Sequence, residues 1–158
     1  MPNALTILHK RDKTSTSSPG WLMWRLTNLW QRRMQDSLDK YRITNFQFLV
    51  LRSIKILGAE LDEVCQADIA NFTNSNPMMV STVIRSLISK GLVERTMSTY
   101  DSRAYKVSLT EVGEKLSEES ARTASKMNKD FFGVIGESQG ELINFLKLLI
   151  ESNDYKVR

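Results

Sequence analysis

The sequence predicts a mainly α-helical fold with one small β-hairpin. Two observations lead to this prediction. Apolar residues recur at helical spacing along most of the chain, whereas the period changes from 3.6 to 2 only around residues 92–109. Long amphipathic segments lie at both ends of this central part. The 158 residues are enough for one domain with its own hydrophobic core.

The first expected element is a long amphipathic helix over residues 21–41, preceded by a flexible, polar tail at residues 1–20. Its apolar positions recur every three to four residues and are Leu22, Leu26, Leu29, Trp30, Met34, Leu38 and Tyr41. Trp21, Trp24 and Trp30 lie within ten residues of one another, which is more aromatic surface than a small core needs. Packing in the chain's own core and a seam with a second copy are equally good explanations.

Two more helices are expected before residue 73. Residues 44–47 match a capping box, and Gly58 is a suitable stop for the helix that begins there. The buried face of this helix is predicted to hold Phe46, Leu49, Val50, Ile54 and Leu57. A short helix over residues 66–72 should direct Ile69 and Phe72 inward.

The next helix is predicted to begin at Asn76 and Pro77, a good N-cap followed by a good first helical residue, and to run to Lys90. Its inward face comprises Val80, Val83, Ile84, Leu87 and Ile88. Strands follow at residues 92–96 and 105–109, joined by a loop. Thr110 should cap a helix that reaches Phe132, and a second capping box at residues 138–141 should open the last helix.

The composition argues against catalysis and metal binding. There is one cysteine and one histidine, His9, which lies in the polar tail, so no catalytic or multi-ligand metal constellation can form within one chain. We therefore expect no enzyme activity, no cofactor and no metal. No apolar run approaches the roughly 20 residues that span a bilayer, and no signal-peptide pattern is present. A cytoplasmic protein without membrane contact is expected.

The net charge of +4 is small, but its distribution is uneven. Residues 75–110 carry five basic and two acidic groups, whereas residues 111–158 carry seven basic and nine acidic groups. The most positive stretch therefore coincides with the helix that begins at Pro77 and with the hairpin. A concentrated basic segment is typical of nucleic-acid binding, although a mild charge alone is also found on ordinary surfaces.

A short helix, a turn, a second helix and a hairpin form an arrangement that can place the second helix in a DNA major groove. If the apolar stripe of that helix faces inward, its outward face has one arginine, no acid and mostly small polar groups: Met78, Ser81, Thr82, Arg85 and Ser89. The hairpin adds Arg95, Arg103 and Lys106, which can project toward a minor groove. Asp101 either pairs with an arginine or simply forms the turn.

Three segments complete the pattern: Gly-Leu-Val-Glu-Arg at residues 91–95, Asp-Ser-Arg at 101–103 and Val-Ser-Leu-Thr-Glu-Val-Gly at 107–113. Together they resemble the signature of MarR-type transcription regulators. The resemblance covers about residues 21–152. It implies a winged helix-turn-helix lobe at residues 44–110 and a dimerisation region formed by residues 21–43 and 111–158.

The resemblance also implies site residues. The recognition helix and wing would contact DNA through Asn76, Pro77, Met78, Ser81, Thr82, Arg85, Lys90, Arg95, Arg103 and Lys106. Asp101 and Arg95 would hold the wing, with Arg103 in the minor groove. The interleaved end helices would form the dimer interface through Trp21, Leu22, Leu26, Leu29, Leu142, Phe145, Leu146 and Leu149.

The resulting hypothesis is a homodimeric transcription regulator, expected to be a repressor, that binds pseudo-palindromic double-stranded DNA and is released by a small aromatic effector. A crevice for that effector would be lined by Trp24, Trp30, Met34, Phe46, Phe48 and Met127, although core packing explains these residues better. Cys65 is interpreted as a small filler, with redox sensing as the minor alternative. Met78 and Met79 form fewer hydrogen bonds than the Arg or Ser often found at these positions in MarR-type regulators. A protein-interaction adaptor or antirepressor is therefore the alternative function.

Overall fold

The computed structural model describes residues 18–101 and 103–154. Its elements follow one another in the order α2 (Pro19–Leu38), η1 (Asp39–Tyr41), α3 (Asn45–Leu57), α4 (Gln66–Phe72), α5 (Pro77–Ser89), β1 (Val93–Met97), β2 (Tyr105–Leu109), α6 (Glu111–Phe132), η2 (Gly133–Ser138) and α7 (Gln139–Asn153). The predicted class, mainly α-helical with one hairpin, is confirmed. None of the described helices is long and apolar enough to cross a membrane.

Helix α2 begins two residues earlier than predicted. The Ser18 hydroxyl accepts a hydrogen bond from the backbone N–H of Trp21 at 3.4 Å, and Pro19 occupies the first helical position. Pro19 and Gly20 are therefore helical rather than part of the expected tail. The rest of that tail, residues 1–17, lies outside the described residues.

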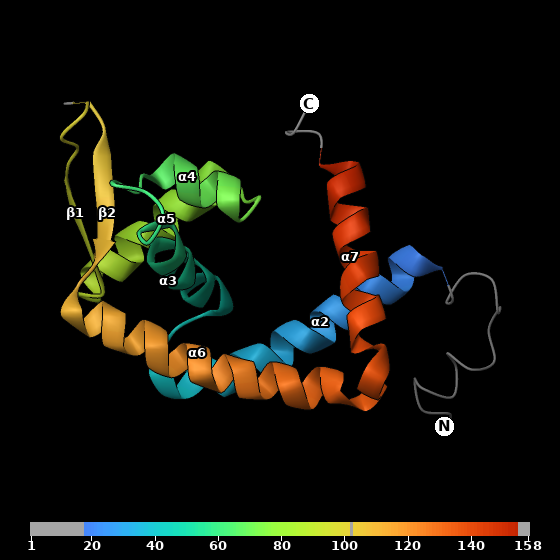
Figure 1. Ribbon diagram of the computed structural model, residues 1–158. Helices are drawn as coiled ribbons and strands as arrows, with labels where there is room; N and C mark the ends of the chain where they lie inside the picture. The colour runs from blue at the N-terminus through green and yellow to red at the C-terminus, as the bar shows by residue number, and fades with distance from the viewer. Residues whose placement is uncertain (1–17, 102, 155–158) are drawn as a thin grey trace, which may run out of the picture.

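Helices α3, α4 and α5 and the hairpin form one lobe, which lies above the long helix α6 in Figure 1. Its centre is fully buried and includes Val50, Leu51, Ile69, Val80, Leu87 and Val93. The strands pair antiparallel with Arg95 opposite Val107. The backbone N–H of Val107 also donates to the Val64 carbonyl oxygen at 2.8 Å, which joins the hairpin to the segment before α4.

Two residues predicted to face inward are exposed. Leu49 is 39% exposed because the buried stripe of α3 runs through Gln47, Val50, Leu51 and Ile54, and position 49 falls outside it. Phe72 is 51% exposed because it is the last residue of α4, beyond the part of the helix that packs on the core. Both errors come from a periodicity that does not specify where the stripe stops.

Helices α2 and α6 pack along each other and connect the lobe to the rest of the chain (Figure 1). The Trp30 Nε1–H donates to Asn128 Oδ1 at 2.8 Å, and the Tyr41 hydroxyl lies within hydrogen-bond distance of the Glu119 carbonyl oxygen at 3.0 Å. The side chain of Gln35 accepts from the backbone N–H of Asn45 at 3.0 Å and so ties α2 to the start of α3. These contacts hold the lobe in place relative to α2 and α6.

Helix α7 stands apart from the lobe (Figure 1), and none of its residues is buried. The capping box predicted at its start is wrong, because the Ser138 side chain makes no capping hydrogen bond. With ψ near 1°, Ser138 does not have the extended backbone of an N-cap. It instead ends a 3₁₀ segment that is kinked at Gly136, where φ is 53°.

Candidate nucleic-acid interface

The start of α5 is held in place from two sides. The Asn76 Oδ1 atom accepts a hydrogen bond from the backbone N–H of Met78 at 2.8 Å, as the sequence predicts for an N-cap. The Gln66 side-chain amide donates to the Pro77 carbonyl oxygen at 3.1 Å, which links α4 to the first turn of α5. The turn between the two helices therefore presents α5 in a fixed orientation.

Three buried residues, Val80, Ile84 and Leu87, hold α5 against the core, while Val83 is only half-buried. Their burial directs Met78, Thr82 and Arg85 into solvent. The Thr82 hydroxyl donates to the Met78 carbonyl oxygen at 3.0 Å, and Arg85 Nη2 donates to Thr82 Oγ1 at 3.3 Å. Since α5 contains no acidic residue, its exposed face has a positive charge and no negative one.

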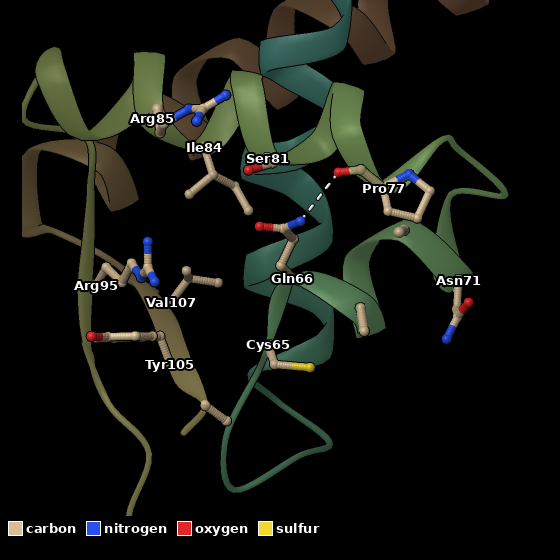
Figure 2. A pocket seen from close by; sticks show the side chains of 13 residues that line it. Cys65, Gln66, Asn71, Pro77, Ser81, Ile84, Arg85, Arg95, Tyr105 and Val107 are labelled. Carbon is tan, nitrogen blue, oxygen red and sulfur yellow. Dashed lines mark hydrogen bonds between the residues drawn. The ribbon is translucent and has the colours of Figure 1, made fainter. Parts of the chain in front are cut away.

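A hollow of about 340 Å³ is lined by α4, α5 and the hairpin. Figure 2 shows Ser81 and Arg85 on its α5 side and Arg95 and Tyr105 on its hairpin side. The Arg95 guanidinium lies 3.8 Å from the centroid of the Tyr105 ring, a cation–π contact that fixes its direction. Arg85 of α5 and Arg95 of the hairpin thus border the same concave surface, and Ser81 lines it rather than pointing outward.

The loop between β1 and β2, called the wing tip below, differs from the sequence prediction for Asp101. Asp101 Oδ1 accepts a hydrogen bond from the backbone N–H of Arg103 at 2.8 Å, and so the turn-forming role of this aspartate is the correct one. The expected pair between Asp101 and Arg95 is not formed within the part of the chain that the structure describes. Arg95 lies in the middle of β1 and packs on Tyr105, whereas Asp101 lies in the loop at the tip. The side chain of Arg103 remains exposed.

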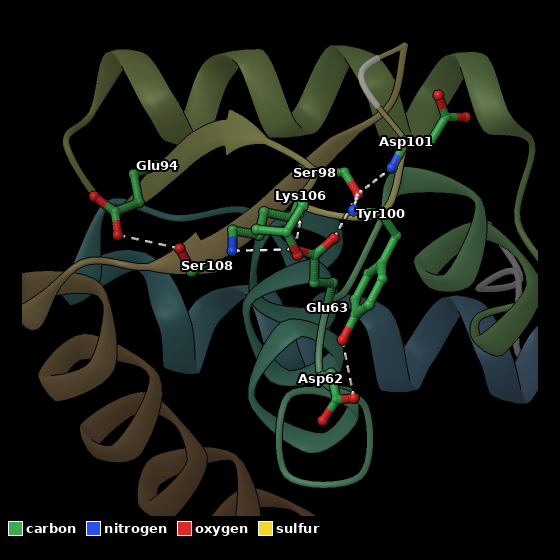
Figure 3. Close-up of polar contacts among 9 residues, drawn as sticks. Asp62, Glu63, Glu94, Ser98, Tyr100, Asp101, Lys106 and Ser108 are labelled. Carbon is green, nitrogen blue, oxygen red and sulfur yellow. Dashed lines mark hydrogen bonds and ion pairs between the residues drawn. The ribbon is translucent and has the colours of Figure 1, made fainter.

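A half-buried carboxylate that the sequence did not reveal, Glu63, anchors the hairpin. Glu63 accepts hydrogen bonds from the Ser98 hydroxyl at 2.6 Å, the Thr99 hydroxyl at 2.6 Å and the Thr99 backbone N–H at 2.9 Å (Figure 3). These hydrogen bonds, first among them the one from Ser98, lower the pKa of Glu63 to about 2. Beside it, the Tyr100 hydroxyl donates to Asp62 at 3.3 Å. The loop before α4 therefore holds the end of β1 and the residues that follow it.

This anchor also includes Lys106, which is predicted from the sequence to contact DNA. Its Nζ lies 3.2 Å from Glu63 Oε1, so its charge is already paired. Lys106 is opposite Thr96 in the hairpin register, whereas Arg95 is opposite Val107, and successive side chains of a strand point to opposite faces. Lys106 therefore lies on the face of the hairpin that is turned away from α5.

Lys90 also has another role in this structure. Its Nζ donates to the Arg42 carbonyl oxygen at 2.7 Å and to Gln47 Oε1 at 2.9 Å. It follows the last residue of α5, whereas the hollow and the exposed turns lie toward the beginning. Lys90 thus connects the end of α5 to the start of α3.

The residues predicted to line an effector crevice do not share one hollow. Met34 is in the core, and Trp30, Phe46, Phe48 and Met127 pack against the core. Trp24 is instead 62% exposed and stacks on Trp21 with ring centroids 5.5 Å apart. Core packing therefore accounts for five of the six residues. Cys65 is half-buried in the lobe, and its burial raises the pKa of its thiol, which suits a small filler.

The residues predicted to form the dimer interface are largely accessible in the single chain. All but one of them are exposed, and Leu142 is half-buried: Trp21, Leu22, Leu26, Leu29, Leu142, Phe145, Leu146 and Leu149. Exposed apolar surface on this scale is unusual for a monomer. It lies on α2 and α7, the two helices at the ends of the described chain.

Comparison with known proteins gives a consistent result. A profile of the MarR family matches residues 43–105. A protein of Bacillus subtilis (strain 168), the uncharacterized HTH-type transcriptional regulator YdcH, is 33% identical over 141 residues, which cover 89% of this chain and 96% of that protein.

Solved structures share the fold at lower identity. BpsR of Bordetella bronchiseptica superimposes with a TM-score of 0.76 at 23% identity, covering 90% of this chain and 98% of that chain. MepR of S. aureus in complex with DNA gives 0.75 at 24% identity, covering 85% and 98%. A mutant E. coli MarR complexed with operator DNA gives 0.74 at 20% identity, covering 83% and 91%. The chain belongs to the MarR family of winged helix-turn-helix transcription regulators.

Proposed function

We propose that two copies of this chain bind one pseudo-palindromic DNA duplex, each with α5 in a major groove and the hairpin tip in the adjacent minor groove. The observation that carries this proposal is the concave surface bordered by Arg85 and Arg95. Arg85 lies on α5, a helix that has no acidic residue. The structures of MepR and of a MarR mutant with DNA support it by likeness of fold.

The contacting residues follow from this arrangement. Asn76, Pro77, Met78, Thr82 and Arg85 lie at or near the N-terminal turns of α5, the part of a recognition helix that reaches base edges. Ser81 and Arg95 border the hollow, where a phosphate group can approach both helix and hairpin. Arg103 is exposed at the wing tip, and a narrow minor groove attracts arginine.

The test is selection from a random-sequence duplex library with the full chain, followed by titration of the enriched duplex at two salt concentrations. We expect Arg103→Ala to weaken binding about tenfold and to reduce the slope of log affinity against log salt by about one, because one cationic contact is lost. Arg122→Ala removes the same charge from an exposed position on α6 and should change neither value. Equal affinities and slopes for Arg103→Ala and the unchanged chain would contradict the wing assignment.

We further propose that the protein acts as a repressor in the cytoplasm and that a small aromatic effector releases it. Support comes from relatives of the same fold: BpsR, whose DNA binding is regulated by 6-hydroxynicotinic acid, and CouR, solved with p-coumaroyl-CoA. A screen for aromatic acids that dissociate the enriched duplex tests this. Retention of the duplex with every compound would argue against an effector of this class.

A protein-interaction adaptor is the second candidate. The exposed Met78 and Met79 at the start of α5 favour it, because methionine-rich surfaces adapt to protein partners. The same selection separates the two functions. An adaptor would enrich no duplex over random DNA, whereas a regulator would enrich a two-fold related sequence.

A further inference from the structure

We propose that α5 recognises its half-site chiefly through thymine methyl groups, and that Met78 is the residue that reads them. This rests on the proposed function, since it assigns the bases that face α5 in the major groove. It concerns the chemistry of the helix surface, which the structure shows to be more apolar than its sequence suggests.

Most hydrogen-bonding groups in the first turns of α5 are already engaged within the protein. The Asn76 side-chain oxygen caps the helix by accepting from the Met78 N–H, and Pro77 has no N–H to donate. The Thr82 hydroxyl donates to the Met78 carbonyl oxygen and accepts from Arg85. Ser81, half-buried, lines the hollow beside the hairpin. The exposed large apolar groups of these turns are the side chains of Met78 and Met79.

Met78 is the most accessible of these residues. It is 79% exposed, more than any other large apolar side chain of the lobe. A side chain so exposed contributes little to the core. Since the N-terminal residues of a recognition helix contact base edges, Met78 would be buried only when α5 enters the groove.

Thymine has the edge that suits this surface. It is the one base of DNA that presents a methyl group in the major groove, beside its O4 acceptor, whereas guanine, adenine and cytosine present only hydrogen-bonding groups there. Methionine is flexible and polarizable and can follow a methyl group closely. A G·C pair below Met78 would present no methyl group to this side chain. The methyl contact therefore favours thymine below Met78.

Arg85 supplies the complementary polar contact. It lies seven residues after Met78, and so two helical turns along the same face, with its guanidinium held by Thr82. An arginine placed in this way can donate to guanine O6 and N7. The proposed half-site therefore combines thymines below the first turn of α5 with a guanine below Arg85.

The test replaces each thymine of the enriched duplex, one at a time, by deoxyuridine, which removes the methyl group and leaves base pairing unchanged. We expect binding to weaken about fourfold at the thymines that Met78 contacts, the value of one buried methyl group. The Met78→Ala chain should bind both duplexes equally, and Met78→Leu should retain part of the difference. Val112→Ala, which shortens an exposed apolar side chain at the start of α6, should retain all of it.

Three outcomes would overturn the inference. Deoxyuridine at every half-site thymine could leave the affinity unchanged, which would leave the proposed function intact. The loss could persist undiminished in Met78→Ala, which would assign the methyl contact to another residue. Failure to enrich any duplex would remove the proposed function together with this inference. Circular dichroism of the exposed-site variants checks that each one is folded.

Discussion

Gly113 permits the closest approach between the start of α6 and the rest of the lobe. A Cβ atom at this position would lie 1.9 Å from the carbonyl oxygen of Leu92, an impossible separation. The neighbouring contacts keep the two segments together: the Thr110 hydroxyl donates to the Gly91 carbonyl oxygen at 2.7 Å, and the Thr110 N–H donates to Leu92 at 3.2 Å. A glycine is therefore required here because a larger residue would clash with Leu92. Its backbone conformation, which is that of an ordinary helix, does not require glycine.

We predict that Gly113→Ala lowers the free energy of unfolding by about 2 kcal/mol or more, because α6 must shift away from the backbone of Leu92. Urea denaturation followed by circular dichroism measures this change. Gly140→Ala is the control, since no atom lies within 4 Å of its added Cβ. That substitution should be neutral or stabilising by up to about 1 kcal/mol. Equal stability of Gly113→Ala and the unchanged chain would disprove the close approach.

The hairpin is an element with little core of its own. Val93 and Val107 are buried, whereas most of β1 is exposed. Its position therefore depends on contacts with neighbouring segments, chiefly the three hydrogen bonds that Ser98 and Thr99 donate to Glu63. Glu63 therefore holds the segment that leads into the loop with Arg103, the arginine proposed to contact DNA.

We predict that Glu63→Gln weakens binding of the enriched duplex. We also predict that its stability depends less on pH between 4.5 and 2 than that of the unchanged chain. The pKa of Glu63 is lowered from 4.5 to about 2 in the folded chain, so its contribution is complete above pH 4.5 and is lost as the pH falls toward 2. The difference in melting temperature between the unchanged chain and Glu63→Gln should therefore shrink over that interval. Glu60→Gln, exposed in the same loop, is the control. A difference independent of pH would refute the role of the charge.

The sequence predicts local features of these elements well and the contacts between them poorly. The caps at Thr44, Asn76 and Thr110 form as predicted, because each depends on residues within three positions along the chain. The anchor at Glu63 lies 36 residues from Thr99 and depends on how the loop before α4 meets the hairpin. Periodicity and spacing contain no such information. The contact between Lys106 and Glu63, 43 residues apart, has the same origin.

At the scale of the whole molecule, two surfaces lie apart from each other. The lobe presents α5 and the hairpin, with Arg85 and Arg95 beside one hollow, whereas α2 and α7 present apolar side chains. Helix α7 has no buried residue, although six of its large apolar side chains are exposed: Ile143, Phe145, Leu146, Leu148, Leu149 and Ile150. Such a helix adds little to the stability of a single copy of the chain. Its apolar face is explained if a second copy covers it and sets the distance between two lobes.

We therefore predict that the double variant Phe145→Glu, Leu149→Glu is monomeric in sedimentation velocity experiments, whereas the unchanged chain is a dimer. Charged groups at two positions that are 65% and 51% exposed in one chain would be buried unpaired in the dimer, at a high cost. A monomer reaches only one half-site, while a dimer holds two recognition helices about one helical turn of DNA apart. The affinity of the double variant for the enriched duplex should therefore fall by about a hundredfold or more. Val112→Glu, 64% exposed at the start of α6, should remain dimeric and bind normally, and a monomeric unchanged chain that binds both half-sites would contradict the prediction.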